Sequence, residues 1–143
     1  MNKFAPVIVV DDDPEDFELV QEIWKDLKLP YPLIFFTYGQ QLLDYLKAGE
    51  EIPFIIISDV NLAGMHGFEL RKKILEDKSA RHKSIPFIFW SGTATENQIK
   101  EAYELSSHGF FIKAGSFIKL KEIIKDIIAY WHKSEVPFLD EAH

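Results

Sequence analysis

Phe54-Ile55-Ile56-Ile57-Ser58-Asp59 is the stretch of this chain that decides its fold. Four apolar residues in a row predict a strand that is buried on both faces, because a half-exposed strand alternates apolar and polar side chains. The run ends at a carboxylate, Asp59. Taken alone, Asp59 fits a turn or a helix cap as well as it fits a functional role.

Four further apolar runs predict strands of the same kind, and three of these also end at a residue able to take part in phosphate chemistry. The four runs are Val7–Val10, Leu33–Phe36, Phe87–Trp90 and Phe110–Ile112. The first continues into Asp11-Asp12-Asp13, the third into Ser91 and the fourth into Lys113.

Helical patterns follow the strands. Asp13 is a suitable N-cap and Pro14 a suitable first helical residue. Thr95-Glu96-Asn97-Gln98 resembles a capping box for a later helix, which we expect to end at His108-Gly109. Gly115-Ser116 precedes the last helix, which carries one apolar stripe. The stripe consists of Phe117, Leu120, Ile124, Ile127 and Trp131.

Strand and helix therefore alternate five times without hairpin signals. This predicts an α/β fold, a doubly wound, five-stranded parallel sheet with helices on both faces. The carboxyl ends of parallel strands share one edge, where ligands bind in such sheets. We expect one domain over residues 1–133, followed by a short tail over residues 134–143.

Composition excludes several classes of protein. The net charge of −7 argues against a nucleic-acid partner, which would need clustered Lys and Arg. The chain has no cysteine, and therefore no disulfide and no thiolate metal site. No apolar stretch approaches the roughly 20 residues of a membrane helix. We expect a cytoplasmic protein that contacts neither nucleic acid nor membrane.

The predicted edge of the sheet gathers a set of chemical groups. Asp11 and Asp12 repel each other at a strand end unless a hard cation such as Mg²⁺ lies between them. With Asp59 they form a three-carboxylate cluster, and a carboxylate can attack phosphorus to give an acyl phosphate. Lys113 and the Ser91 hydroxyl would offset the charge of the transferred group. Each has a simpler alternative, since a lysine at a strand end is commonly solvated and Ser91-Gly92 is an ordinary turn.

The order and spacing of these motifs are familiar. From Phe4 to Trp131 the chain resembles the receiver domain of two-component response regulators, the CheY-like signal-transduction proteins. The matching motifs are Val9-Val10-Asp11-Asp12-Asp13-Pro14, Ser58-Asp59-Val60-Asn61-Leu62, Met65-His66-Gly67-Phe68-Glu69-Leu70, Pro86-Phe87-Ile88-Phe89-Trp90-Ser91-Gly92 and Gly109-Phe110-Phe111-Ile112-Lys113.

The resemblance implies a flavodoxin-like (βα)5 fold with strand order 2-1-3-4-5. It implies a phosphorelay protein whose Asp59 becomes a phospho-aspartate, with a histidine kinase or phosphotransfer protein as donor. Asp12 and Asp59 would bind Mg²⁺ directly together with the backbone carbonyl of Asn61, and Asp11 would act mostly through water.

Other roles follow from the same resemblance. Ser91 and Lys113 would hold the phosphoryl oxygens, and Ser91 with Phe110 would form the conformational switch. Asn61 and Thr93 match positions that tune phosphate lifetime. The downstream protein partner would bind the face formed by the helix after Thr95, the fifth strand and the last helix.

Three positions depart from the family pattern. Ala114 replaces a proline that often follows a cis bond, and because a non-proline cis bond costs about 3 kcal/mol we expect a trans peptide after Lys113 and a shifted loop. Ala63 also replaces a frequent proline, which predicts a looser loop. His66 replaces a frequent Asp.

The end of the chain is similar to that of receivers associated with bacterial phytochromes. The similar segments are Tyr130-Trp131-His132-Lys133 and Val136-Pro137-Phe138. Some of those receivers dimerise through this region, so the resemblance allows a homodimer. We expect a stand-alone receiver without a DNA-binding module, whose output is a protein contact.

Three alternatives stay open. Asp11-x-Asp13 superficially fits the nucleophile motif of a dehalogenase-type phosphatase, which would show turnover, whereas a receiver would only assist its own phosphorylation. A flavodoxin-like FMN binder would need a loop rich in hydroxyls and glycine after the first strand, where this chain has carboxylates. A degenerate receiver would bind partners without phosphate.

Overall fold

The structure is a computed structural model that describes residues 4–77, 80–113 and 115–137. Its strands are β1 Val7–Val10, β2 Leu33–Phe36, β3 Ile55–Asp59, β4 Phe87–Ser91 and β5 Phe110–Ile112. Its helices are α1 Pro14–Asp26, α2 Gly39–Ala48, α3 Gly67–Glu76, α4 Ala80–Ser84, α5 Glu96–Glu104 and α6 Phe117–Lys133.

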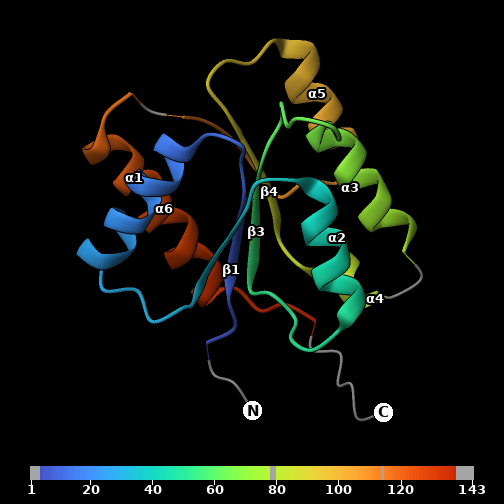
Figure 1. The fold of residues 1–143 in the computed structure, drawn as a ribbon, viewed down its shortest axis with the longest axis horizontal. Coiled ribbons are helices and arrows are strands. Elements are labelled where there is room, and N and C mark those ends of the chain that lie inside the picture. Colours follow the sequence, from blue (N-terminus) through green and yellow to red (C-terminus); the bar gives the residue numbers. More distant parts are fainter. Residues whose placement is uncertain (1–3, 78–79, 114, 138–143) are drawn as a thin grey trace.

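All strand pairs are parallel, and the sheet has the order β2-β1-β3-β4-β5. The helices α1 and α6 cover one face, and α2, α3 and α5 lie on the other (Figure 1). The predicted fold class and strand order are confirmed. The apolar runs account for this, since a strand covered on both faces carries apolar residues throughout. The central strands β1, β3 and β4 are fully buried, whereas β2 and β5, at the two edges of the sheet, are only partly buried.

The structure differs from the sequence-based expectations at two helices. The short helix α4 was not predicted, because its sequence, ARHKS, has no apolar periodicity. The helix α5 ends at Glu104 rather than at His108-Gly109. Ser106, with φ 59°, turns the chain away from the helix, and the His108 N–H already donates to the carbonyl of Phe87 at 2.8 Å. His108 and Gly109 therefore lead into β5.

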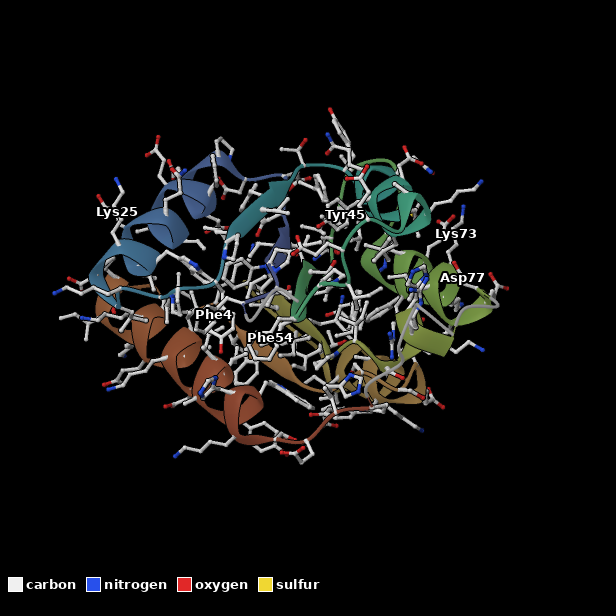
Figure 2. The ribbon with its side chains drawn as sticks, turned by 90° about the horizontal axis from the view of Figure 1, so that it is seen from below. Phe4, Lys25, Tyr45, Phe54, Lys73 and Asp77 are labelled. Carbon is white, nitrogen blue, oxygen red and sulfur yellow. The ribbon has the colours of Figure 1, made fainter. Side chains whose placement is uncertain are left out.

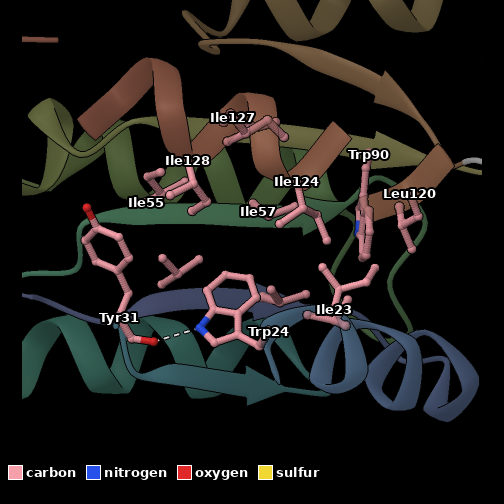
Figure 3. Packing of buried hydrophobic residues seen from close by; sticks show 14 residues of the cluster. Ile23, Trp24, Tyr31, Ile55, Ile57, Trp90, Leu120, Ile124, Ile127 and Ile128 are labelled. Atoms are coloured by element: carbon pink, nitrogen blue, oxygen red, sulfur yellow. Dashed lines mark hydrogen bonds between the residues drawn. The ribbon is translucent and has the colours of Figure 1, made fainter. Parts of the chain in front are cut away.

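Two apolar layers enclose the sheet. The layer between the sheet and α1 and α6 contains Trp24, whose indole N–H donates to the carbonyl of Tyr31 at 2.7 Å (Figure 3). Leu120, Ile124 and Ile127 of the predicted α6 stripe are buried, whereas Phe117 and Trp131 are only partly buried. No helix in the described ranges is both long and apolar enough to cross a bilayer.

An aromatic group closes the amino-terminal edge of the sheet, which Figure 2 views from below. The ring of Tyr31 stacks on Phe54 at 4.6 Å between centroids and meets Phe4 edge-on at 5.3 Å. The Tyr31 hydroxyl lies 2.6 Å from Nδ1 of His132, so the last turn of α6 is bonded to this group. The polar edge of the sheet lies at the opposite end of the strands.

Arg71 joins α3 to the end of α5. Its side chain is 1% exposed, its Nε donates to the carbonyl of Leu105 at 3.1 Å and its Nη2 to that of Ser106 at 2.9 Å. Burial lowers the pKa of Arg71 to about 10, which leaves it charged at neutral pH. The guanidinium also lies 5.0 Å from the centre of the Phe87 ring. Arg71 thus satisfies carbonyls that the end of a helix leaves unpaired.

We expect Arg71→Met to lower the free energy of unfolding by roughly 2 kcal/mol, because two carbonyls lose their donors. Lys72→Met is the matched control, since Lys72 is exposed on the same helix, and its effect should stay within about 0.5 kcal/mol. Urea unfolding of both variants measures the difference. Equal stability of the two variants would contradict a joining role for Arg71.

Candidate functional site

Polar side chains converge at the carboxyl edge of the sheet, the upper end of β1, β3 and β4 in Figure 1. Asp11 and Asp12 directly follow β1, and Asp59 is the last residue of β3. The register explains the convergence, since Val10 pairs with Ser58, one residue before Asp59. One carboxylate oxygen from each of the three residues lies within 4.8 Å of those from the other two, an arrangement that could hold a metal ion.

Lys113 brings a positive charge into this cluster. Its Nζ lies 2.9 Å from Oδ2 of Asp11 and 2.9 Å from Oδ2 of Asp59. A third carboxylate, Asp16 on α1, also lies 2.9 Å from the same nitrogen. The Lys113 N–H donates to the carbonyl of Ser91 at 2.7 Å, which sets the lysine beside the end of β4. The side chain of Lys113 is therefore a partner of the cluster, not a solvated surface group.

Backbone amides hold the carboxylates in place. Asp11 Oδ1 accepts from the N–H of Asp13 at 2.9 Å, and Asp13 caps α1 by accepting from Glu15, as predicted. Asp59 Oδ1 accepts from the N–H of Asn61 at 3.1 Å. Each bond fixes a carboxylate at a strand end without using the oxygen that faces Lys113.

The loop after β3 is bonded to Asp12. The N–H of Ala63 donates to Asp12 Oδ2 at 3.1 Å. A proline has no N–H and could not make this bond. The replacement of a frequent proline by Ala63, which predicted a looser loop, thus adds a hydrogen bond that restrains it. His66 takes over as the N-cap of α3, where its Nδ1 accepts from the N–H of Phe68 at 3.1 Å.

The electrostatics of the site favour a cation. Asp11 is fully buried, and this burial raises its pKa to about 7, although the contact with Lys113 opposes the shift. Burial alone would lower the pKa of Lys113, but its contacts with Asp16, Asp59 and Asp11 raise it above its usual value. Three carboxylates contact this one ammonium, and Asp12 adds a fourth carboxylate to the cluster. Such a set of oxygen ligands with surplus negative charge suits Mg²⁺.

The other predicted site residues lie at different depths. Ser91 is buried at the end of β4, whereas Asn61 and Thr93 are exposed on the loops after β3 and β4. Phe110 is half-buried in the layer under α2, α3 and α5, with its ring centroid 6.4 Å from that of Phe89. The expected trans peptide after Lys113 involves Ala114, which lies outside the described residues.

Asp16 is the residue that sequence reasoning missed. Its place in the first turn of α1 is explained equally well by the helix dipole, which favours an anion there. Helical spacing holds a signal that could have found it, because Asp16 lies four residues before Val20 and seven before Ile23, both buried on α1. An acidic residue on the buried face of a helix needs a partner. That partner is Lys113.

The comparisons with known proteins agree with one another. The sequence profile of the response regulator receiver domain matches residues 7–125. The chain is 27% identical over 134 residues to chemotaxis protein CheY-3 of Vibrio cholerae, covering 89% of this chain and 94% of that protein. It is 24% identical over 129 residues to the probable methanogenesis regulatory protein FilR2 of Methanothrix harundinacea, covering 87% of this chain and 82% of that protein.

Solved structures show the same architecture. The phosphorylated cyanobacterial phytochrome response regulator RcpA superposes with a TM-score of 0.84 at 25% identity, over 94% of this chain and 99% of that one. Response regulator RPA3017 of R. palustris, from red light signalling, has a TM-score of 0.82 at 22% identity, with the same coverage of 94% and 99%. The second likeness is a likeness of fold alone.

Gly67 closes the loop after β3. A Cβ at this position would lie 2.3 Å from the backbone oxygen of Asp59 and 3.0 Å from the oxygen of Val60. The Gly67 N–H also donates to the Val60 carbonyl at 2.8 Å. The first turn of α3 therefore approaches β3 so closely that only glycine fits, and this contact helps to define where the chain carrying Asp59 turns.

Gly67→Ala should displace the backbone at Asp59 and destabilise the protein by about 2 kcal/mol, because the added methyl meets backbone that cannot move aside. Gly115→Ala is the control, since its Cβ would meet nothing within 4 Å. Thermal unfolding of the two variants tests this. If Gly67→Ala melts at the temperature of the control, the close approach is not a constraint.

Proposed function

Because the chain belongs to the response regulator receiver domain family, we propose that it takes a phosphoryl group onto Asp59 and passes the signal on through a protein contact. Receiver domains are signalling modules rather than classical enzymes. One observation carries the proposal: the carboxylate of Asp59 lies 2.9 Å from the Lys113 ammonium and within the oxygen cluster that Asp11 and Asp12 complete.

The step is a displacement at phosphorus. A carboxylate oxygen of Asp59 attacks the phosphorus of a phosphohistidine in a histidine kinase or phosphotransfer protein, and the P–N bond breaks. The electron pair of that bond stays on the imidazole, which can take a proton from solvent. Lys113 binds the oxygens of the arriving group as they gain charge, and the Ser91 hydroxyl donates to one of them.

The donor set fits a magnesium ion. Carboxylate oxygens of Asp12 and Asp59, together with the backbone carbonyl of Asn61, would hold it directly, and Asp11, in the same oxygen cluster, would act mostly through water. When bound, Mg²⁺ would offset the negative charge shared by the carboxylates and the phosphoryl group. The raised pKa of Asp11 agrees with this set, since burial disfavours its anion even beside Lys113 and a second cation would favour it.

Phosphorylation would be transmitted from Ser91 to Phe110. The strands β4 and β5 that carry them are adjacent, with Phe89 paired to Phe110. Phe110 is only partly buried, so its ring has room to change its exposure. Asn61 and Thr93 are exposed on the loops after β3 and β4. They would affect the access of water and with it the lifetime of the acyl phosphate.

The downstream protein would bind the face of α5, β5 and α6. This face exposes large apolar side chains from all three elements, which a protein partner could cover. They are Ile99 and Tyr103 of α5, Ile112 of β5 and Ile118 of α6. A homodimer through the end of α6 stays a prediction; Tyr130, near that end, is 64% exposed. The cytoplasmic location, the absence of nucleic-acid and membrane partners, and the limits of the domain also stay predictions.

Incubation with acetyl phosphate and Mg²⁺ should add the mass of one phosphoryl group to the wild-type protein, measured on the intact chain. Asp59→Asn should add none, because the amide cannot form the acyl phosphate. Glu18→Gln, which removes an exposed carboxylate of α1, should behave as wild type. A wild-type protein that gains no mass would favour a receiver that binds partners without phosphate.

Magnesium should raise the melting temperature of the wild-type protein. At 100 times the dissociation constant, the gain in unfolding free energy is about 2.7 kcal/mol. Asp59→Asn should weaken this gain, because it removes a charged ligand. Sodium chloride at equal ionic strength controls for screening of the clustered charges. An unchanged melting temperature across millimolar Mg²⁺ would exclude the proposed cation site.

A further inference from the structure

We propose that Asp16 is a positioning residue for Lys113, the group that keeps the ammonium at the site when the other carboxylates turn to the cation and the phosphoryl group. The inference rests on the proposed function, because it gives Asp16 a part in the same phosphoryl transfer. Asp16 belongs neither to the three-carboxylate cluster nor to the groups that would touch phosphate.

The argument starts from the number of donors on Lys113. An ammonium has three N–H donors. In the structure Nζ has three carboxylate oxygens at 2.9 Å, from Asp11, Asp59 and Asp16. Two of these contacts, with Asp16 and Asp59, are hydrogen bonds, and the third, with Asp11, is an ion pair alone. A phosphoryl oxygen that binds Lys113 therefore competes with these carboxylates for the ammonium.

The three contacts are not equivalent. Asp11 and Asp59 also contribute to the cation cluster, and Asp59 is the residue that gains the phosphoryl group. Their hold on Lys113 therefore changes during the reaction. The contact with Asp16 does not have to change, because the carboxylate of Asp16 lies outside that cluster. Asp16 can hold the ammonium while the other two donors turn to phosphate.

Asp16 is itself well fixed. It lies in the first turn of α1, behind the Asp13 cap and Pro14, and its side chain is 15% exposed. Val20 on the same face of α1 is fully buried against the sheet. A lysine side chain is long and flexible, so a contact from a rigid helix removes much of its freedom before the reaction.

A second group limits the ammonium from the side of β4. The Lys113 Nζ lies 5.2 Å from the centre of the Trp90 ring, within the range of a cation–π contact. Trp90 is 3% exposed, so its ring cannot swing away into solvent. Asp16 and Trp90 thus hold Lys113 from two elements, and neither competes for the cation or the phosphoryl oxygens.

The simpler explanation is that Asp16 only balances the dipole of α1. Glu15 separates the two explanations, because it lies in the same first turn and carries the same charge. Glu15 is exposed, and its carboxylate is not among those that contact Lys113. A dipole effect predicts equal consequences for the two residues, whereas positioning predicts a consequence for Asp16 alone.

The experiment measures the rate at which acetyl phosphate phosphorylates Asp59 in saturating Mg²⁺. Acetyl phosphate is a small donor, so effects on the docking of a partner protein are excluded. Asp16→Ala should lower the rate by roughly tenfold, because a displaced catalytic group costs about that much or more. Glu15→Ala should stay within about twofold. In a Lys113→Ala background, Asp16→Ala should cause no further loss, because two changes that act through one group are not additive.

A second measurement does not depend on phosphorylation. The ammonium signal of Lys113 in ¹⁵N NMR of the metal-free protein should shift and exchange faster with water in Asp16→Ala and stay unchanged in Glu15→Ala. If Asp16→Ala does not fold, Asp16→Asn keeps an acceptor but loses the charge, and it should show both changes in smaller degree.

The outcomes are distinct. Equal rates for the Asp16 and Glu15 variants with an unchanged Lys113 signal would overturn the inference, as would a further loss of rate in the Lys113→Ala background. A wild-type protein that takes up no phosphoryl group, but whose Lys113 signal depends on Asp16, would overturn the proposed function and leave the positioning of Lys113 by Asp16 intact.

Discussion

The contact of the Lys113 ammonium with three carboxylates is the interaction on which this site depends. Asp11 directly follows β1, Asp16 lies in the first turn of α1 and Asp59 ends β3, and each lies 2.9 Å from the same nitrogen. Without a positive charge between them, the negatively charged carboxylates would repel one another and disfavour the folded state. The fold tolerates the cluster because Lys113 directly follows β5 and lies beside the end of β4, where its backbone N–H donates to the carbonyl of Ser91. Lys113 therefore stabilises the acidic edge.

The rest of the molecule acts as a rigid frame for that edge. The central strands β1, β3 and β4 are buried on both faces, so their ends cannot shift without disturbing two apolar layers. Gly67 lets α3 approach the backbone of Asp59 closely, and Arg71 bonds α3 to the end of α5. A change at the edge has a physical route to the exposed face of α5, β5 and α6, because β4 and β5 are directly paired.

The departures from the family pattern are accommodated by local hydrogen bonds. Ala63 supplies an N–H to Asp12 that a proline would lack, and the His66 ring caps α3 where an Asp is frequent. Both replacements lie in the loop after β3 and leave the carboxylates in place. Residues of this loop can thus differ from the family pattern while the acidic edge keeps its geometry. The loop is restrained by hydrogen bonds from backbone N–H groups, which all residues except proline provide.

The sequence by itself determined the strands, the fold class and most of the site. Apolar runs such as Ile55–Ile57 can be stable only inside a sheet covered on both faces, and the residues that end them must then meet at one edge. Only the tertiary structure decided where α5 ends, that a short helix precedes β4, and that Asp16 binds Lys113. Local sequence could not settle these points, since the turn at Ser106 and the pairing of His108 with Phe87 depend on β4. The partner of Asp16 lies 97 residues away along the chain, and a contact of that kind exists only once the sheet brings α1 and the end of β5 together.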